Sequence, residues 1–173
     1  MLFSNWINKL IKLFFNIFII IIVVLIVIVM YSNYQTLFLG KKYVNYGGYT
    51  FLEVVSGSMS GSIEVNDLVV VKLDTKDVKE GDIITYQSND ELITHRIVKI
   101  NGDSVITKGD SNNTWDKEFQ KSEIIGKVVY VVSGFGIWRK VLFSPKVLLS
   151  IVVTCVLFAI YFSIRDYLNV KGS

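Results

Sequence analysis

The stretch "DIITYQSNDELITHRIVKINGDSVITK", residues 82–108, contains three apolar-rich runs separated by two turn signals. "DIITYQ" and "ELITHRIVKI" flank the turn residues "SND", and "NGD" leads into "SVITK". Runs rich in β-branched and aromatic residues, bounded by Gly, Asn, Asp and Ser, are typical of strands joined by tight turns. The stretch therefore predicts consecutive antiparallel strands.

The same pattern continues on both sides of this stretch. "TFLEVV" and "DLVVVKL" precede it at residues 50–55 and 67–73, a charged connector with Gly81 at a turn follows them, and "EIIGKVVYVVS" comes after it at residues 123–133. No segment between these runs has helical periodicity. We predict one small, mostly antiparallel β domain over residues 36–145 of this 173-residue chain.

Apolar residues make up 51% of the chain, and the excess lies at its two ends. Residues 13–40 carry no charge, and their centre reads "IFIIIIVVLIVIVM". Because about 20 apolar residues span a bilayer, residues 1–35 are predicted to contain an N-terminal transmembrane helix. A cleavable signal peptide is the competing interpretation. It needs a shorter apolar core and a small-residue cleavage site, which "MYSNYQTLFLG" lacks, so a retained anchor is favoured.

The second apolar run, "VLLSIVVTCVLFAIYFSI" at residues 147–164, is 18 residues long and uncharged. That length is near the lower limit for a membrane span, and a buried core helix is the alternative. The position of the run at the end of the chain, between Lys146 and Arg165, favours a span. Residues 146–173 are therefore predicted to form a C-terminal transmembrane helix and a short tail.

The formal charge of +3 comes from the two ends of the chain. Residues 1–12 contribute two lysines, residues 41–146 carry fourteen basic and fourteen acidic side chains, and the tail after residue 164 carries two basic side chains and one acidic one. Two spans put both termini on one side of the membrane, and basic ends indicate that this side is the cytoplasm. In this integral membrane protein the β domain is then extracytoplasmic. Its neutrality gives no electrostatic footprint for nucleic acid, and the sole cysteine, Cys155, lies in the second apolar run, so the domain has no disulfide.

Aromatic residues gather beside both apolar runs, and Tyr and Trp favour the headgroup layer of a membrane. They are Tyr31, Tyr34, Phe38, Tyr43, Tyr46, Tyr49, Phe135 and Trp138. Two compatible interpretations follow: an aromatic belt that anchors the spans, and a β domain that touches the bilayer near its working face.

His95 is the only histidine and lies within "LITHRIV". Strand alternation places it on one face with Ile93 and Ile97, and places Arg96 on the other face. A histidine between two isoleucines is by default a partly buried core residue with its nitrogens satisfied.

The segment "TKGDSNNTWD", residues 107–116, contains a turn with two acids, Asp110 and Asp116, six residues apart. Either acid has an ordinary structural role as a turn cap, because Asp bonds local backbone N–H groups. A calcium loop would need glycine at its sixth position, where Trp115 stands, so no metal is predicted. "NNT" is also a formal N-glycosylation sequon, which matters only in a glycosylating host.

Ser58 lies in "EVVSGSMSGS", a small, polar segment that has the composition of a turn. A serine hydroxyl is a poor nucleophile until a positioned base takes its proton, and no Lys or His lies within a dozen residues. The base must come from elsewhere in the fold, and His95 is the only histidine available. The chain order Ser, His, Asp is acceptable because catalytic triads are defined by geometry.

Together these segments resemble the type I signal peptidases of the endoplasmic-reticulum type, which also occur in archaea and some Gram-positive bacteria. "SGSM", "DLVVVK", "GDIITY", "THRIV" and "TKGDSNNTWD" follow in that order over residues 54–132, behind an apolar helix. The bacterial type uses a Ser–Lys dyad, and the position of that lysine holds His95 here. The resemblance implies a membrane-bound serine endopeptidase of mostly β fold that cleaves signal peptides from exported preproteins, without a cofactor.

The resemblance also assigns roles by position. Ser58 matches the nucleophile, Ser56 the serine whose hydroxyl helps line the oxyanion hole beside the Ser58 N–H, and His95 the general base. Asp116 matches the usual orienter of the histidine, with Asp110 as second choice. The family usually has proline where this chain has Gly61, and glycine is expected to keep this turn but loosen it.

The expected partners are signal-peptide-bearing preproteins and membrane lipid, with no nucleic acid; the sequence does not indicate whether accessory subunits take part. Two other functions stay open. One is an inactive, membrane-anchored β-domain scaffold or binding protein. The other is a different membrane-tethered serine hydrolase on a β scaffold.

Overall fold

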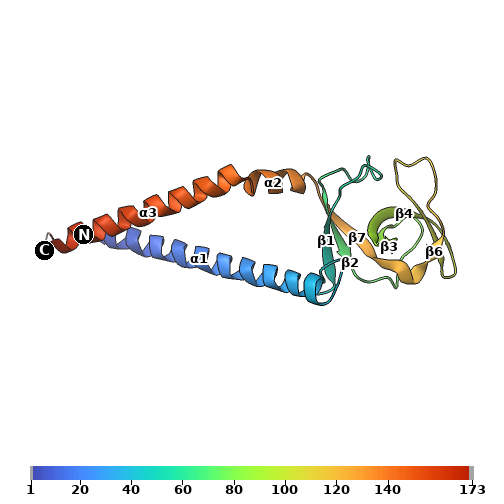
Figure 1. Cartoon of the computed structure of the whole chain (residues 1–173), viewed down its shortest axis with the longest axis horizontal. Helices are drawn as coiled ribbons and strands as arrows, with labels where there is room; N and C mark the ends of the chain where they lie inside the picture. The colour runs from blue at the N-terminus through green and yellow to red at the C-terminus, as the bar shows by residue number, and fades with distance from the viewer. Residues whose placement is uncertain (1, 172–173) are drawn as a thin grey trace.

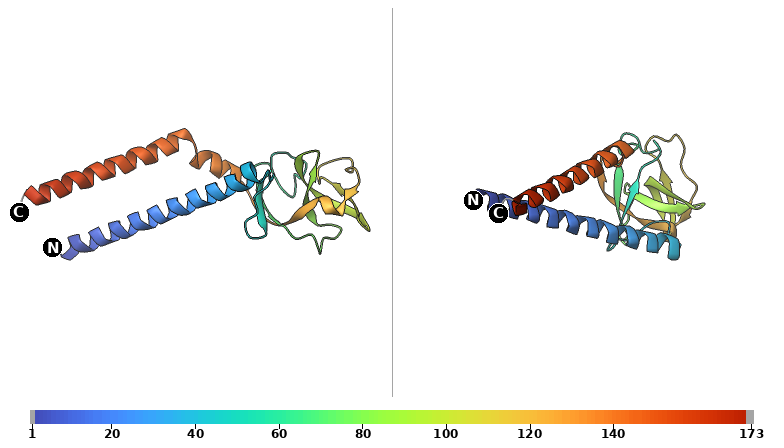
Figure 2. Two further views of the ribbon diagram at one scale, coloured as in Figure 1. Left: turned by 60° about the horizontal axis from the view of Figure 1, so that its bottom comes forward. Right: turned by 60° about the vertical axis from the view of Figure 1, so that its left-hand side comes forward.

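The computed structural model describes the backbone of residues 2–171 and the side chains of residues 9–158, 160, 161, 164 and 165. A β domain lies at one end of the molecule, and two long helices, α1 (Leu2–Asn33) and α3 (Pro145–Lys171), extend from it. Both helices extend from the domain toward the same side, with opposite chain directions, so the start of α1 and the end of α3 lie at the same end of the molecule (Figures 1 and 2).

The β domain is built on one antiparallel seven-stranded sheet, which confirms the predicted mostly β, antiparallel fold. The strand order is β1-β2-β7-β3-β4-β5-β6. The bounds are β1 (Tyr49–Glu53), β2 (Leu68–Lys72), β3 (Ile83–Ser88), β4 (Glu91–Asn101), β5 (Ser104–Lys108), β6 (Phe119–Gln120) and β7 (Ile124–Val132), with a 3₁₀ turn, η2 (Lys121–Glu123), before β7. β3, β4 and β5 form the predicted hairpins of residues 82–108.

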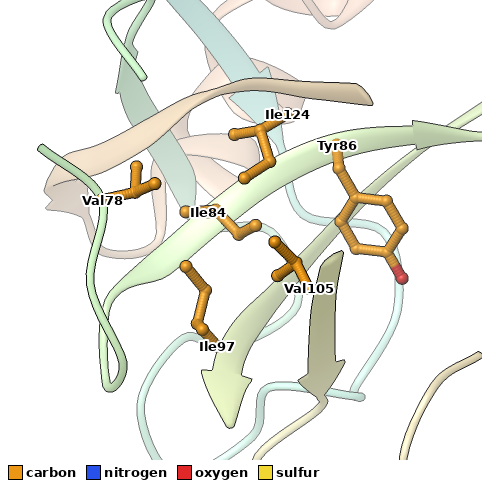
Figure 3. Close-up of a cluster of buried hydrophobic side chains, with 6 residues drawn as sticks. All are labelled: Val78, Ile84, Tyr86, Ile97, Val105 and Ile124. Atoms are coloured by element: carbon orange, nitrogen blue, oxygen red, sulfur yellow. The ribbon is translucent and has the colours of Figure 1, made fainter. Parts of the chain in front are cut away.

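One core lies beneath β3, β4 and β5, where the alternate side chains of each strand point inward. It consists of Val78, Ile84, Tyr86, Ile97, Val105 and Ile124 (Figure 3). Ile84 and Val105 are fully buried, and the Tyr86 hydroxyl lies at the edge of the cluster. Since strand side chains alternate between faces, this apolar set also fixes which face His95 occupies.

A second core lies under β1, β2 and the loop between them. Its buried members are Met59, Ile63, Val69 and Val71. Two of the four come from the loop and two from β2, so the small polar segment around Met59 is attached to the sheet by apolar side chains. The loop is therefore a packed part of the domain.

The N-terminal apolar helix is present as expected. α1 continues into a π-helix, η1 (Tyr34–Phe38), and the segment Lys9–Phe38 is long and apolar enough to cross a membrane. The second apolar run is also helical. In the part of the chain that is described, however, it reaches the length and apolarity of a span only when α2 (Phe135–Leu142) and Pro145–Phe158 are counted as one helix bent by 50°.

The short helix α2 was not predicted from the sequence. Its polar side faces the domain: the Gly136 N–H donates to Asn66 O at 2.7 Å, Arg139 pairs with Glu53 at 3.0 Å, and Lys140 Nζ donates to Asn66 Oδ1 at 2.8 Å. Most of its apolar side chains are exposed, and Trp138 is 66% exposed. Its apolar face points away from the domain, the reverse of a surface helix in a soluble protein, and its eight residues are only about two turns, too few for a clear helical period.

Candidate active site

The loop of residues 54–67 joins β1 to β2 and is anchored at both its stem and its centre. At the stem, the Asn66 N–H donates to Val54 O at 2.9 Å. At the centre, Met59 and Ile63 are 2% and 1% exposed within the second core. The serine before Met59 is thereby held at a fixed place on a turn whose other small residues face solvent.

Ser58 is half-buried, and its hydroxyl lies next to that of Ser56, with the two Oγ atoms 3.3 Å apart. Ser56 itself is exposed. Both hydroxyls therefore lie at the same point on the loop surface.

Gly61, where the resembling family usually has proline, has a φ of +97°. Proline fixes φ near −65° and has no N–H, whereas the Gly61 N–H donates to Glu64 Oε1 at 2.7 Å. This loop therefore follows a backbone path that excludes proline. The sequence led us to expect a looser turn, but this hydrogen bond and the buried Met59 and Ile63 hold the loop.

His95 lies on β4 directly opposite Ile84 of β3, on the face that lines the first core. The residue is 7% exposed, as expected for a histidine between two isoleucines. Its Nδ1 lies 2.6 Å from Asp116 Oδ2. The other ring nitrogen, Nε2, makes no described hydrogen bond. Because every fully buried side-chain nitrogen or oxygen among the described residues has a hydrogen-bond partner, Nε2 must be accessible from the surface. The ring is thus held from one side and available from the other.

Asp116 is the centre of a buried polar cluster at the end of β5. Its Oδ2 accepts hydrogen bonds from Thr107 Oγ1 at 2.6 Å and from the Tyr86 hydroxyl at 3.3 Å, in addition to facing His95. Its N–H donates to Thr107 O at 2.9 Å. Burial is the main cause that raises the pKa of Tyr86, and the Asp116 carboxylate adds to it, so this hydroxyl stays protonated and donates.

Asp110 has a different partner. Its carboxylate accepts two hydrogen bonds from Arg96, from Nε at 2.9 Å and from Nη2 at 2.7 Å. These bonds are the main cause that lowers the pKa of Asp110. Arg96 also donates to Gly81 O at 2.9 Å and to Ser62 Oγ at 3.3 Å. The Arg96–Asp110 pair therefore links Gly81, which lies just before β3, to the Ser58 loop and to the turn that holds both acids. Of these two acids, only Asp116 contacts His95.

The acidic turn and the Ser58 loop are in direct contact. The Ser111 N–H donates to Ser58 O at 2.9 Å, and Ser111 Oγ donates to Ser60 O at 2.8 Å. A Cβ added to Gly109 would lie 2.6 Å from Ser58 O, so only glycine permits this approach. The β4–β5 ladder ends at the pair of Arg96 and Lys108, and Gly109 is the residue that follows Lys108.

Gly109 therefore lies against the Ser58 carbonyl, one residue beyond the strand position paired with Arg96, which follows His95 in the chain. The described structure has no hydrogen bond between Ser58 Oγ and the imidazole. In free enzymes the contact between nucleophile and base is often long, and it tightens when substrate binds.

Sequence reasoning missed Thr107 and Tyr86 as parts of this cluster. A signal for Thr107 exists: alternation in "SVITK" places it on the same inward face as Val105, and a polar residue at such a position requires a partner. Gly109 gives no local signal, because its role depends on the distant Ser58 carbonyl. No group of three or more His, Cys, Asp or Glu side chains that could hold a metal ion is found among the described side chains.

Comparisons with known proteins agree with the motif order. Residues 27–129 match the model of the Peptidase S24-like family. The chain is also similar to Signal peptidase I W of Bacillus subtilis (strain 168), with 42% identity over 76 residues that make up 40% of each protein. The chain thus spans about 40% of the length of this relative, and its resemblance to the type I signal peptidases is confirmed. Because the family model covers more than half of its residues, the chain belongs to the Peptidase S24-like family.

Proposed function

We propose that this protein is a membrane-bound serine endopeptidase that cleaves signal peptides from exported preproteins. The observation that carries the proposal is the 2.6 Å contact between His95 Nδ1 and Asp116 Oδ2, beside the loop that holds Ser58. A histidine fixed by a carboxylate, with its other nitrogen open, is the arrangement that a serine nucleophile requires. Membership of a peptidase family and the similarity to a signal peptidase support it.

In the proposed reaction Ser58 Oγ attacks the scissile carbonyl carbon while His95 Nε2 takes its proton. Asp116 holds the imidazole tautomer and stabilises the imidazolium that forms. The Ser58 N–H and the Ser56 hydroxyl receive the oxyanion, and each such donor contributes about 3 kcal/mol. His95 then gives its proton to the leaving amine, the C–N bond breaks, and water hydrolyses the acyl-enzyme through the same base.

Thr107 and Tyr86 support this assignment because both donate to Asp116 Oδ2, the oxygen that faces His95. A carboxylate held by two further donors keeps one orientation. We therefore assign Asp116 as the residue that orients His95. Asp110, which pairs with Arg96, has a structural role and stabilises the surrounding loops.

The membrane arrangement belongs to the same proposal. The helix over Lys9–Phe38 is the N-terminal anchor, and α3 is a second anchor that follows the bend after α2. Residues 36–145 then form the extracytoplasmic catalytic domain, with both termini in the cytoplasm. The apolar part of a signal peptide stays in the bilayer, so the anchors confine enzyme and substrate to one plane and raise their effective concentration. The family resemblance implies small residues at the first and third positions before the cut.

The test uses the full-length protein in lipid vesicles with a signal-bearing precursor. We expect one cut, seen as a defined mass change, and a loss of about 10⁴-fold or more in Ser58→Ala and in His95→Ala. Ser60→Ala is the matched control, because Ser60 lies in the same loop and contributes its carbonyl to the contact with Ser111. Its activity should stay within about twofold of wild type.

Each result that contradicts the proposal would indicate a different conclusion. Cleavage that survives Ser58→Ala excludes Ser58 as the nucleophile. Hydrolysis of small esters without cleavage of any precursor indicates another serine hydrolase. No hydrolysis by the folded wild-type protein indicates the inactive scaffold or binding protein.

A further inference from the structure

The end of the N-terminal helix is joined to the β domain by a specific polar contact, the Gln35 latch, formed by the Gln35 side chain and the Asn45 main chain. Gln35 Nε2 donates to Asn45 O at 3.0 Å, and Gln35 Oε1 accepts from the Asn45 N–H at 3.0 Å. The side-chain amide therefore satisfies both polar groups of one residue, as a neighbouring strand would. Gln35 is 3% exposed.

Three tyrosines extend the latch toward the sheet. The Tyr31 hydroxyl donates to Asn45 O at 2.9 Å, and Ser32 Oγ lies 2.6 Å from the Tyr46 hydroxyl. Tyr46 is in turn bridged to Tyr49, the first residue of β1, through both of its main-chain polar groups. A continuous set of hydrogen bonds thus joins the apolar helix to the edge of the sheet.

Gln35, the helix side of the latch, lies within η1, where the helix widens to π geometry at the end of its apolar segment. A buried amide without partners costs free energy, because it loses its hydrogen bonds to water. Gln35 is therefore either bonded to Asn45 or drawn out to solvent. In the first state Asn45 is fixed beside η1, and in the second this side of the domain is held to α1 only by the Tyr31 and Ser32 contacts.

The connecting residues show what the latch prevents. Residues 39–44 join η1 to Asn45; the Leu39 N–H donates to Tyr34 O at 3.3 Å and the Lys41 N–H donates to Gln35 O at 3.1 Å, so residues 42–44 lie between the last of these hydrogen bonds and Asn45. Three extended residues reach roughly 10 Å, whereas one residue of an extended substrate covers about 3.3 Å. Opening the latch together with the Tyr31 and Ser32 contacts would thus let this side of the domain move by up to about three substrate residues.

We propose that Gln35 is a positioning residue that sets the height of the β domain above the membrane and so selects which peptide bond of a membrane-held substrate reaches Ser58. This inference rests on the proposed function. Gln35 acts through the anchor and touches no reacting group. The contacts of α2 with Glu53 and Asn66 hold the other side of the domain, so an open latch tilts the domain about α2.

The test compares wild type, Gln35→Ala, Gln35→Glu and the control Gln87→Ala, which removes an exposed glutamine on β3. Full-length proteins in vesicles cut a precursor that carries several acceptable bonds in consecutive register. We expect one dominant product from wild type and Gln87→Ala. In Gln35→Ala the ratio of the dominant product to its neighbours should fall by roughly tenfold, the weight of one to two net hydrogen bonds. Gln35→Glu keeps the bond from the Asn45 N–H and should fall between them.

A short soluble peptide is not held in the bilayer, so Gln35→Ala should cut it within about twofold of the wild-type rate. Loss of this activity would indicate a damaged site and overturn the inference. An unchanged product ratio in vesicles would overturn it as well.

A second measurement does not need catalysis. Spin labels at Met30 and Lys99, both exposed, report the distance between α1 and β4 in a Cys155→Ser background. We expect a narrow distance distribution in wild type and a broad one in Gln35→Ala. If wild type fails to cut any precursor, the proposed function fails, and the two distributions still decide whether the latch positions the domain. Equal distributions would reject the latch.

Discussion

Asp110 and Asp116 lie six residues apart in one turn, yet their partners predict different effects on substitution. In Asp116→Asn the carboxylate that faces His95 Nδ1 becomes an amide, which supports the wrong imidazole tautomer. We expect kcat to fall by about 10³- to 10⁴-fold with little change in folding. In Asp110→Asn we expect kcat within about tenfold of wild type and a lower melting temperature. Precursor cleavage and thermal unfolding of both variants measure this contrast, and equal losses of kcat would contradict it.

The same pair gives a pH dependence with a definite sign. Arg96 lowers the pKa of Asp110 in the folded state, so the ion pair stabilises the protein above the unfolded pKa of about 3.9. That stabilisation is lost as pH falls through the lower, folded pKa. The difference in melting temperature between wild type and Asp110→Asn should therefore be full above about pH 5 and shrink below about pH 4. Its size is small because Arg96 is partly exposed and screened by solvent.

Gly61 leads to a prediction against the family pattern. Gly61→Pro introduces the residue that the family usually has, but the φ of +97° and the hydrogen bond to Glu64 are both incompatible with proline. Strain of about 1–3 kcal/mol and a lost bond of about 1 kcal/mol should lower the free energy of unfolding.

Gly61→Ala separates these two contributions, since it keeps the N–H and meets no atom within 4 Å. It should destabilise the protein less than Gly61→Pro in chemical denaturation. A proline variant as stable as wild type would show that this loop takes the family path.

Ser58, His95 and Asp116 are candidates from the sequence because the order of the motifs that hold them resembles that of the type I signal peptidases. Their mutual contacts could not be derived in that way, because each depends on where distant segments pack. Gly109 illustrates this: it is essential to the approach of the acidic turn to Ser58 O, and its sequence context indicates only a turn. Arg96 was placed on the face opposite His95, but alternation says nothing of its reach to Asp110.

The strands were predictable because their apolar pattern matches a sheet with one buried face. Predicted and observed bounds of β5 agree, and those of β1 to β4 and β7 differ by at most two residues at either end. β6 has only two residues, too few to form a pattern. Helix α2 has only eight residues, about two turns, so its helical period is too short to be recognised in the sequence, and its apolar face points outward.

The orientation of α2 predicts contact with the membrane surface. Ile137, Trp138 and Val141 are more than half exposed, while Arg139 and Gly136 on the other side bind the domain. A helix with one apolar face beside a membrane anchor is expected to lie in the headgroup layer. In a Trp6→Phe, Trp115→Phe background, Trp138 fluorescence should be quenched most by bromines placed near the headgroup end of the lipid chain.

Matched variants of α2 check this prediction. Ile137→Ser with Val141→Ser removes apolar area on the same face and should reduce the quenching. A Trp138 signal insensitive to brominated lipid would mean that α2 faces water or another protein.

Over the whole protein, two separate connections hold the β domain to its helices. The Gln35 latch joins α1 to the β1 edge, and α2 joins the stem of the Ser58 loop to α3. The helices leave the domain from different places and converge toward their far ends (Figure 1). A domain held at two points cannot rotate freely, so in the proposed membrane arrangement both connections together set the location of Ser58 relative to the bilayer.

This arrangement predicts the membrane topology, because two helices running in the same direction from one domain put both termini on the side away from that domain. Single cysteines in a Cys155→Ser background test it in intact cells. Lys99→Cys on β4 should react with a membrane-impermeant maleimide, while Lys12→Cys and Arg165→Cys should react only after the membrane is opened. Labelling of Arg165→Cys in intact cells, with Lys12→Cys protected, would mean that α3 does not cross the membrane. The domain would then depend on α1 alone as its anchor, and the Gln35 latch with the Tyr31 and Ser32 contacts would alone set its position.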